Sequence, residues 1–148
     1  MDRVALSLSA QWGGMTHRFN LFLVALVSFG LLDGLWLGVL MGGFYRSQLS
    51  LLARMSGDKL APLWMPALLV YVLLAFGIVA FVIPRTPAGS PILRGALFGL
   101  VVYGVYDLTN LSTLKGWPIV LTAIDIAWGA AASAAATWIV TNADRWLR

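Results

Sequence analysis

The sequence predicts an all-α membrane protein, a bundle of four transmembrane helices joined by short loops. Hydrophobic residues make up 60% of its 148 residues and charged residues only 11%, whereas a soluble domain has about 25% charged residues. Several apolar stretches are long enough to cross a bilayer, and they lack the alternation of membrane-barrel strands. Because hydrocarbon offers no hydrogen bonds, helices are the remaining structure that satisfies the backbone.

Four stretches contain the roughly 20 apolar residues that a membrane-spanning helix needs. Glycine or proline marks several of their ends: Gly42 ends the first stretch, Pro62 begins the second and Pro84 ends it. The expected spans cover residues of about 19–42, 62–84, 95–113 and 117–141. Together they predict one transmembrane domain, residues 18–148.

Residues 1–17 precede the first span and are expected to form an interfacial or partner-binding arm. Their apolar run, Val4 to Leu8, is shorter than the usual signal-peptide core, and no cleavage site is clear. A cleaved signal peptide is the alternative. Four spans put both termini on one side, and six of the ten basic residues lie there, which favours cytoplasmic termini.

Composition also excludes several classes of function. The chain has no Cys, which removes disulfides, thiolate nucleophiles, iron–sulfur clusters and Cys-ligated zinc. Its net charge of +4 is spread over short loops, and no basic run would follow a nucleic-acid backbone, so no nucleic-acid partner is expected. The expected spans contain neither His nor Lys, and the single histidine, His17, is expected to be interfacial and solvated. We predict no cofactor, no metal site and no catalytic residue.

Three of the six acidic residues lie inside the expected spans, and these are Asp33, Asp107 and Asp125. A carboxylate in hydrocarbon costs several kcal/mol unless it is paired, hydrated or protonated, so each one indicates a function. The alternating directions of the spans put all three within about 12 Å of the same membrane face. Two interpretations stay open, because each Asp either clamps neighbouring helices together or joins the others in a polar pocket.

Aromatic and polar residues accompany these carboxylates at helical spacing. Trp36 follows Asp33 by three residues and Trp128 follows Asp125 in the same way, so each pair shares a helix face. Tyr71 of the second span is expected at a similar depth. The candidate ligand-binding residues are Asp33, Trp36, Tyr45, Arg46, Tyr103, Tyr106, Asp107, Asn110, Lys115, Asp125 and Trp128. The two basic residues among them would balance the carboxylates or bind an anionic group.

Small residues predict close contacts between helices. Gly38 and Gly42 are four residues apart, as are Gly95 and Gly99, and Gly129 begins a run of small residues in the fourth span. We expect these glycines to pack the helices of the bundle against one another. Docking to another subunit is the alternative.

Three segments resemble a bacterial family of predicted membrane proteins, domain of unknown function 2177. They are LDGLWLG at 32–38 with FYR at 44–46, YGVYDLTNLSTLKGWP at 103–118, and DIAWG at 125–129. The resemblance covers roughly residues 20–140. It implies a four-helix protein of the bacterial inner membrane, and it implies no activity.

Three functions fit these patterns. The first is a protein that binds or carries an amphiphile, a lipid headgroup or a cation in the acidic and aromatic pocket. The second is an accessory or assembly subunit of a larger membrane complex. The third is a lipid-modifying membrane enzyme, in which one carboxylate does acid–base chemistry. The expected partners are the lipid bilayer and a homo-oligomer or a larger membrane complex.

Overall fold

A computed structural model describes residues 2–57, 59–83 and 89–147, with the backbone alone for residues 2–12. Helices dominate this part of the chain, and a short antiparallel hairpin pairs Met55 with Leu60. The elements are α1 (Asp2–Leu35), η1 (Trp36–Leu40), α2 (Gly42–Leu49), β1 (Met55–Ser56), β2 (Lys59–Leu60), α3 (Trp64–Gly77), η2 (Ile78–Val82), α4 (Pro91–Thr113) and α5 (Ile119–Trp146), where η1 and η2 are π-helical. The predicted all-α class is therefore confirmed.

Four helical stretches are long and apolar enough to cross a membrane, and they follow the predicted order. They are Gly13–Leu40, Trp64–Val82, Pro91–Thr113 and Ile119–Trp146. Pro84, the expected end of the second span, lies outside the described residues.

The N-terminal segment differs from the prediction. Residues 2–17 belong to the same helix as the first candidate span, because α1 continues without a break from Asp2 to Leu35. Their interfacial or partner-binding role stays a prediction. The 34 residues of α1 make a helix about 50 Å long. Among the residues whose side chains are described, the first candidate span is Gly13–Leu40, which includes residues that precede the expected start near residue 19.

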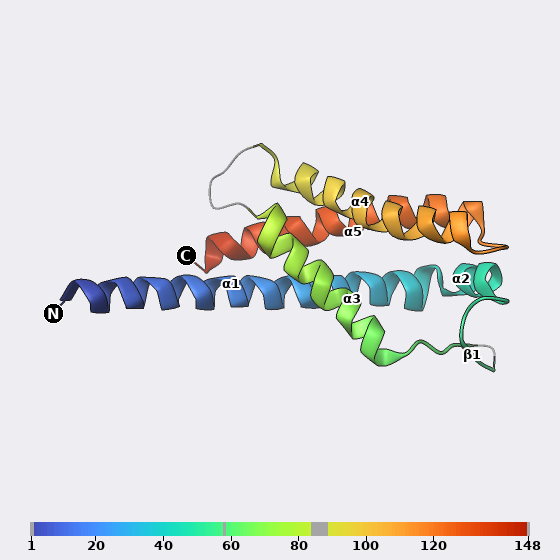
Figure 1. Cartoon of the computed structure of the whole chain (residues 1–148), viewed down its shortest axis with the longest axis horizontal. Helices are drawn as coiled ribbons and strands as arrows, with labels where there is room; N and C mark the ends of the chain where they lie inside the picture. Colours follow the sequence, from blue (N-terminus) through green and yellow to red (C-terminus); the bar gives the residue numbers. More distant parts are fainter. Residues whose placement is uncertain (1, 58, 84–88, 148) are drawn as a thin grey trace.

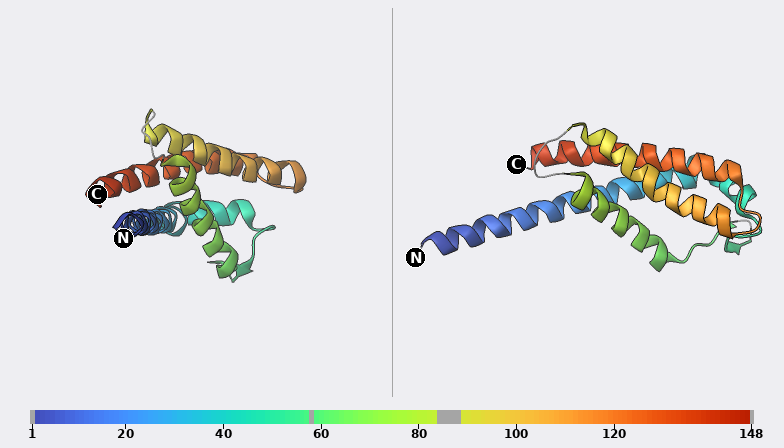
Figure 2. Two further views of the ribbon diagram at one scale, coloured as in Figure 1. Left: turned by 60° about the vertical axis from the view of Figure 1, so that its left-hand side comes forward. Right: turned by 45° about the horizontal axis from the view of Figure 1, so that its top comes forward.

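The long helices α1, α4 and α5 run roughly side by side, and α3 crosses them obliquely (Figures 1 and 2). α4 and α5 form a hairpin whose turn contains Gly116, at a φ of 86° that glycine adopts without strain. Both ends of the described chain lie at one end of the molecule, and α2, β1 and the α4–α5 turn lie at the other (Figure 1). This arrangement makes α1 and α5 antiparallel neighbours.

The apolar core sits where α1, α3 with η2, and α5 cross. The small residues Ala132 and Ala136 of α5 belong to this core together with larger residues of the other helices. The buried core residues are Leu21, Ala25, Phe29, Leu74, Ala75, Ile78, Val79, Val82, Ala132, Ala136 and Val140.

Glycines of α4 lie directly against α5. A Cβ added at Gly99 would lie 2.0 Å from the carbonyl oxygen of Gly129, and one at Gly95 would lie 2.2 Å from Thr137 Oγ1. A Cβ at Gly129 would in turn lie 2.2 Å from the Tyr103 ring. The absence of side chains at these positions therefore permits the close approach of the two helices.

The contact between helices that was expected at Gly38 and Gly42 is not observed in the part of the chain that the structure describes. A Cβ at Gly38 would meet no described atom within 4 Å, so this glycine packs against no other described helix. A Cβ at Gly42 would lie 2.4 Å from the carbonyl oxygen of Leu37 in the preceding turn. Gly42 thus serves the local junction between η1 and α2 and not a contact between helices.

Candidate functional site

Carboxyl groups and aromatic rings from separate elements gather at the end of the bundle that carries α2. The antiparallel packing of α1 and α5 brings their two Asp-x-x-Trp segments together. We call this group the acidic-aromatic centre, and its members are Asp33, Trp36, Tyr45, Tyr103, Asp107, Asp125 and Trp128.

The two Asp-x-x-Trp segments are joined reciprocally. The indole N–H of Trp128 donates a hydrogen bond to Asp33 Oδ1 at 2.7 Å. In the opposite direction, the indole N–H of Trp36 donates to the Tyr45 hydroxyl at 3.1 Å, and this hydroxyl donates to Asp125 Oδ1. Trp128 therefore donates directly to the aspartate of the opposite helix, whereas Trp36 is connected to the aspartate of the opposite helix through Tyr45.

The two tryptophan rings also stack on each other. The ring centroids of Trp36 and Trp128 are 4.2 Å apart, and the ring planes differ by 2°. An aromatic pair adds about 0.5–1.5 kcal/mol to the burial of its area. The stack holds both indoles between α1 and α5, where their N–H groups donate to the opposite helix or to Tyr45.

Tyr45 lies on α2, beyond the end of the first candidate span, yet only 6% of it is exposed. The junction at Gly42 turns α2 so that this hydroxyl faces the centre. Burial, followed by the hydrogen bond to Asp125, raises the pKa of the Tyr45 hydroxyl above its ordinary value. Tyr45 is therefore a proton donor throughout the neutral range.

Two further tyrosines surround the same carboxyl groups. Tyr103 packs on Gly129 and lies close enough to Asp33 and Asp125 to interact with both. Tyr71 of α3 is a hydrogen-bonding neighbour of Asp33. Tyr71 is absent from the predicted set of ligand-binding residues, although its polar character inside an apolar span was a usable signal.

Asp107 differs from the other two aspartates. It is 0% exposed, and neither of its carboxylate oxygens has a hydrogen-bond partner among the described residues. The neighbouring Trp117 indole donates instead to Thr122 Oγ1 at 3.1 Å. The amide nitrogen of Asn110, one turn along α4, is also buried without a partner. Burying a polar group in this way is costly unless something satisfies it.

The remaining predicted residues lie at the edge of the centre. Tyr106 is 57% exposed and packs edge-on against Trp117, with ring centroids 6.0 Å apart. Arg46 and Lys115 are exposed. The described hydrogen bonds to Asp33 and Asp125 come from the Trp128 indole and the Tyr45 hydroxyl.

An open, almost wholly apolar groove of about 580 Å³ runs along α1 and is bordered by Ile139 of α5. Its lining extends from Leu23 to Leu35 of α1, a length of about 18 Å at the rise of a helix. Leu32 and Leu35, which flank Asp33 in the sequence, are part of this lining. The groove therefore reaches the turn of α1 that carries one carboxyl group of the centre.

A family model described as "Predicted membrane protein (DUF2177)" matches residues 18–142. The chain belongs to this family. The match includes every candidate ligand-binding residue. It also includes the four candidate spans, apart from residues 13–17 of the first and residues 143–146 of the fourth. Membership in DUF2177 and the four candidate spans identify a multi-pass membrane protein. Comparison with curated proteins and with solved structures found no match.

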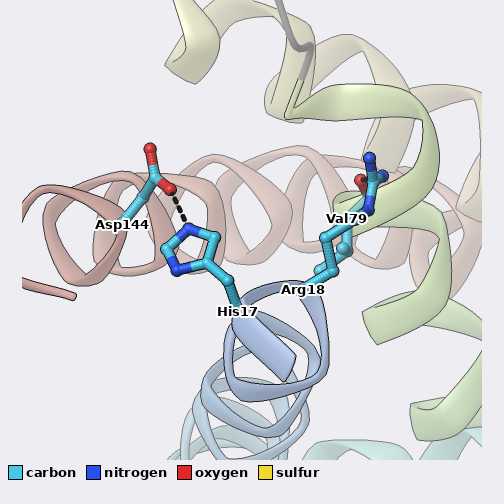
Figure 3. Close-up of polar contacts among 4 residues, drawn as sticks. All are labelled: His17, Arg18, Val79 and Asp144. Atoms are coloured by element: carbon cyan, nitrogen blue, oxygen red, sulfur yellow. Dashed lines mark hydrogen bonds and ion pairs between the residues drawn. The ribbon is translucent and has the colours of Figure 1, made fainter. Parts of the chain in front are cut away.

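In this DUF2177 member, a second polar contact lies at the opposite end of the bundle (Figure 3). His17 Nε2 of α1 lies 2.6 Å from Asp144 Oδ1 of α5. His17 is partly exposed, as a solvated residue would be, but the antiparallel packing also places Asp144 beside it although the two residues are 127 positions apart.

Arginines at this same end donate to the π-helical segment η2. Arg18 donates to the carbonyl oxygen of Val79 at 2.8 Å (Figure 3), and Arg94 Nε donates to that of Val82 at 3.1 Å. The last carbonyls of a helix lack partners within the helix. The two arginines supply partners where the second span ends.

Proposed function

We propose that the protein binds an amphiphile, with a positively charged or hydrogen-bond-donating headgroup at the acidic-aromatic centre. The observation that carries this proposal is the meeting of carboxyl groups from α1, α4 and α5, of which Asp107 is buried without a hydrogen-bond partner among the described residues. Such a group requires a donor or a cation. The rings around it suit a cationic headgroup, since aromatic faces attract cations.

The apolar groove on α1 supports an amphiphile over a simple ion. It ends among the residues that flank Asp33, so an acyl chain lying in it would bring its headgroup toward the centre. We further propose the bacterial inner membrane as the location, with cytoplasmic termini, as the distribution of basic residues favours.

Native mass spectrometry after gentle extraction tests this proposal. We expect the protein to retain an amphiphile of defined mass and Asp125→Asn to lose most of it. Asp144→Asn is the matched control, because it alters an aspartate of the same helix at the opposite end of the bundle. Equal retention by both variants, or no adduct on the unaltered protein, would contradict the proposal.

A second candidate function is that of an accessory subunit in a larger membrane complex. The observation that favours it is the spacing of Gly30, Gly34 and Gly38 on α1 and η1, where an added Cβ would meet no described atom within 4 Å. Exposed glycines at this spacing permit the approach of another helix. A defined heavier complex in the same mass-spectrometric experiment would support this function and identify the partner.

A further inference from the structure

The carboxyl group of Asp107 is the least satisfied polar group of the acidic-aromatic centre. It lies inside the third candidate span, is 0% exposed, and has both oxygens without a hydrogen-bond partner among the described residues. Asp33 is also buried, but it accepts the indole N–H of Trp128. Asp107 therefore requires a bound group that satisfies its carboxyl oxygens, here called its occupant, and Asp33 requires none.

The groups that face Asp107 indicate what this occupant is. The titratable groups described as interacting with it are Asp125 of α5, Tyr45 of α2 and Tyr106 of its own helix, and none of these three carries a positive charge. The neighbouring Trp117 indole is uncharged as well. Two carboxyl groups close together without a cation cannot both be ionised at low cost. The occupant is therefore a cation, of which the proton is the smallest.

The nearby Asn110 amide is compatible with a protonated carboxyl group. Its buried nitrogen makes no complete hydrogen bond, although it neighbours the Tyr106 hydroxyl, and an amide N–H can donate only to an acceptor. A protonated Asp107 would present a carbonyl oxygen as that acceptor, while its O–H would be the donor. When another cation replaces the proton, the carboxylate oxygens bind the cation and the amide N–H can still donate to one of them.

We propose that Asp107, with Asp125 beside it, is a cation-exchange site that holds a proton until a cationic group binds and displaces it. The inference rests on the proposed function, because the cationic group is the headgroup of the amphiphile. No covalent bond to carbon changes: the Asp107 O–H bond breaks, the proton leaves to water, and the carboxylate balances the charge of the incoming cation.

Labelling with N,N′-dicyclohexylcarbodiimide tests the protonated state, because this apolar reagent adds to protonated carboxyl groups in membranes. The full chain is labelled in dodecyl maltoside micelles, and the labelled residue is identified by peptide mass. We expect Asp107 to be labelled in preference to Asp33, and labelling above the midpoint to fall about tenfold per pH unit, as one proton requires. Absence of label on Asp107 at every pH would overturn the proposal without any variant having to fold.

Competition with a cation tests the exchange. Dodecylammonium chloride is the probe, and the micelle itself is the control, because dodecyl maltoside has the same chain without the charge. We expect the probe to protect Asp107 and its apparent affinity to rise about tenfold per pH unit while the proton is bound. Labelling that neither the probe nor NaCl suppresses would overturn the exchange. Protection by NaCl alone would support a cation site at Asp107 while contradicting the proposed amphiphile headgroup.

Discussion

At the residue scale, three aspartates with similar surroundings in the sequence have different partners. Asp33 and Asp125 each accept a hydrogen bond from an aromatic side chain of another element. These two join helices as the clamp interpretation describes. Asp107 has no such partner among the described residues, and this observation is what supports the proposed pocket. The distinction matters because a hydrogen bond offsets the cost of burying a carboxyl group, whereas a buried group without a partner bears the full cost of its desolvation.

Trp128→Phe tests the hydrogen bond between helices at Asp33. The substitution keeps an aromatic ring against Trp36 but removes the N–H that donates to Asp33 Oδ1. We expect the free energy of unfolding, measured by SDS titration, to fall by about 1–3 kcal/mol, because a buried acceptor loses its donor. Trp138→Phe, at a 57% exposed position of the same helix, is the control. Equal effects of the two substitutions would show that the bond contributes nothing.

Tyr45→Phe tests the bridge between Trp36 and Asp125. The pKa of the Tyr45 hydroxyl is higher in the folded protein than in the unfolded chain, so its contribution to stability is complete below the unfolded pKa. We expect the difference in unfolding free energy between wild type and Tyr45→Phe to be constant at neutral pH. It should decrease as the pH rises above about 10, the ordinary pKa of tyrosine. A difference that instead grows with alkaline pH would contradict the donor role.

At the element scale, the α4–α5 pair depends on the missing side chains of glycine. Gly99→Ala would place a Cβ where the carbonyl of Gly129 lies, so the helices must separate. We expect a loss of about 1–3 kcal/mol of unfolding free energy, as for other overpacked contacts. Gly104→Ala is the matched control, because Gly104 is buried in the same helix but its added Cβ would meet no described atom within 4 Å. A similar loss for both variants would refute close packing at Gly99.

At the scale of the whole molecule, the four candidate spans predict that the α2 end and the two termini lie on opposite sides of the membrane. The chain has no cysteine, so single cysteines report their own accessibility. We expect Leu51→Cys, at a 97% exposed position near α2, to react with a membrane-impermeant maleimide in intact spheroplasts. Leu147→Cys should react only after permeabilisation if the termini are cytoplasmic. Labelling of both positions in intact spheroplasts would contradict four spans. Labelling of Leu147→Cys in intact spheroplasts, with Leu51→Cys reacting only after permeabilisation, would show that the proposed orientation is inverted.

The sequence alone determined the fold class and the order of the four candidate spans, and it predicted that Asp33, Asp107 and Asp125 share one depth. These properties follow from hydropathy and from the constant rise of a helix, which depend on neighbouring residues along the chain. The same reasoning extends to Gly95 and Gly99, whose spacing indicated a helix contact. Hydropathy did not predict that residues 2–17 belong to α1, because a weakly apolar segment is compatible with either an arm or a helix.

Only the tertiary structure decided which side chains meet. Three contacts join residues that are far apart in the sequence. They are the hydrogen bond from Trp128 to Asp33, the hydrogen bond from Tyr45 to Asp125, and the contact of His17 with Asp144. Such contacts depend on how each helix rotates about its axis and crosses its neighbours. Hydropathy leaves that rotation undetermined in a membrane, because lipid and protein interior are both apolar and do not distinguish the faces of a helix.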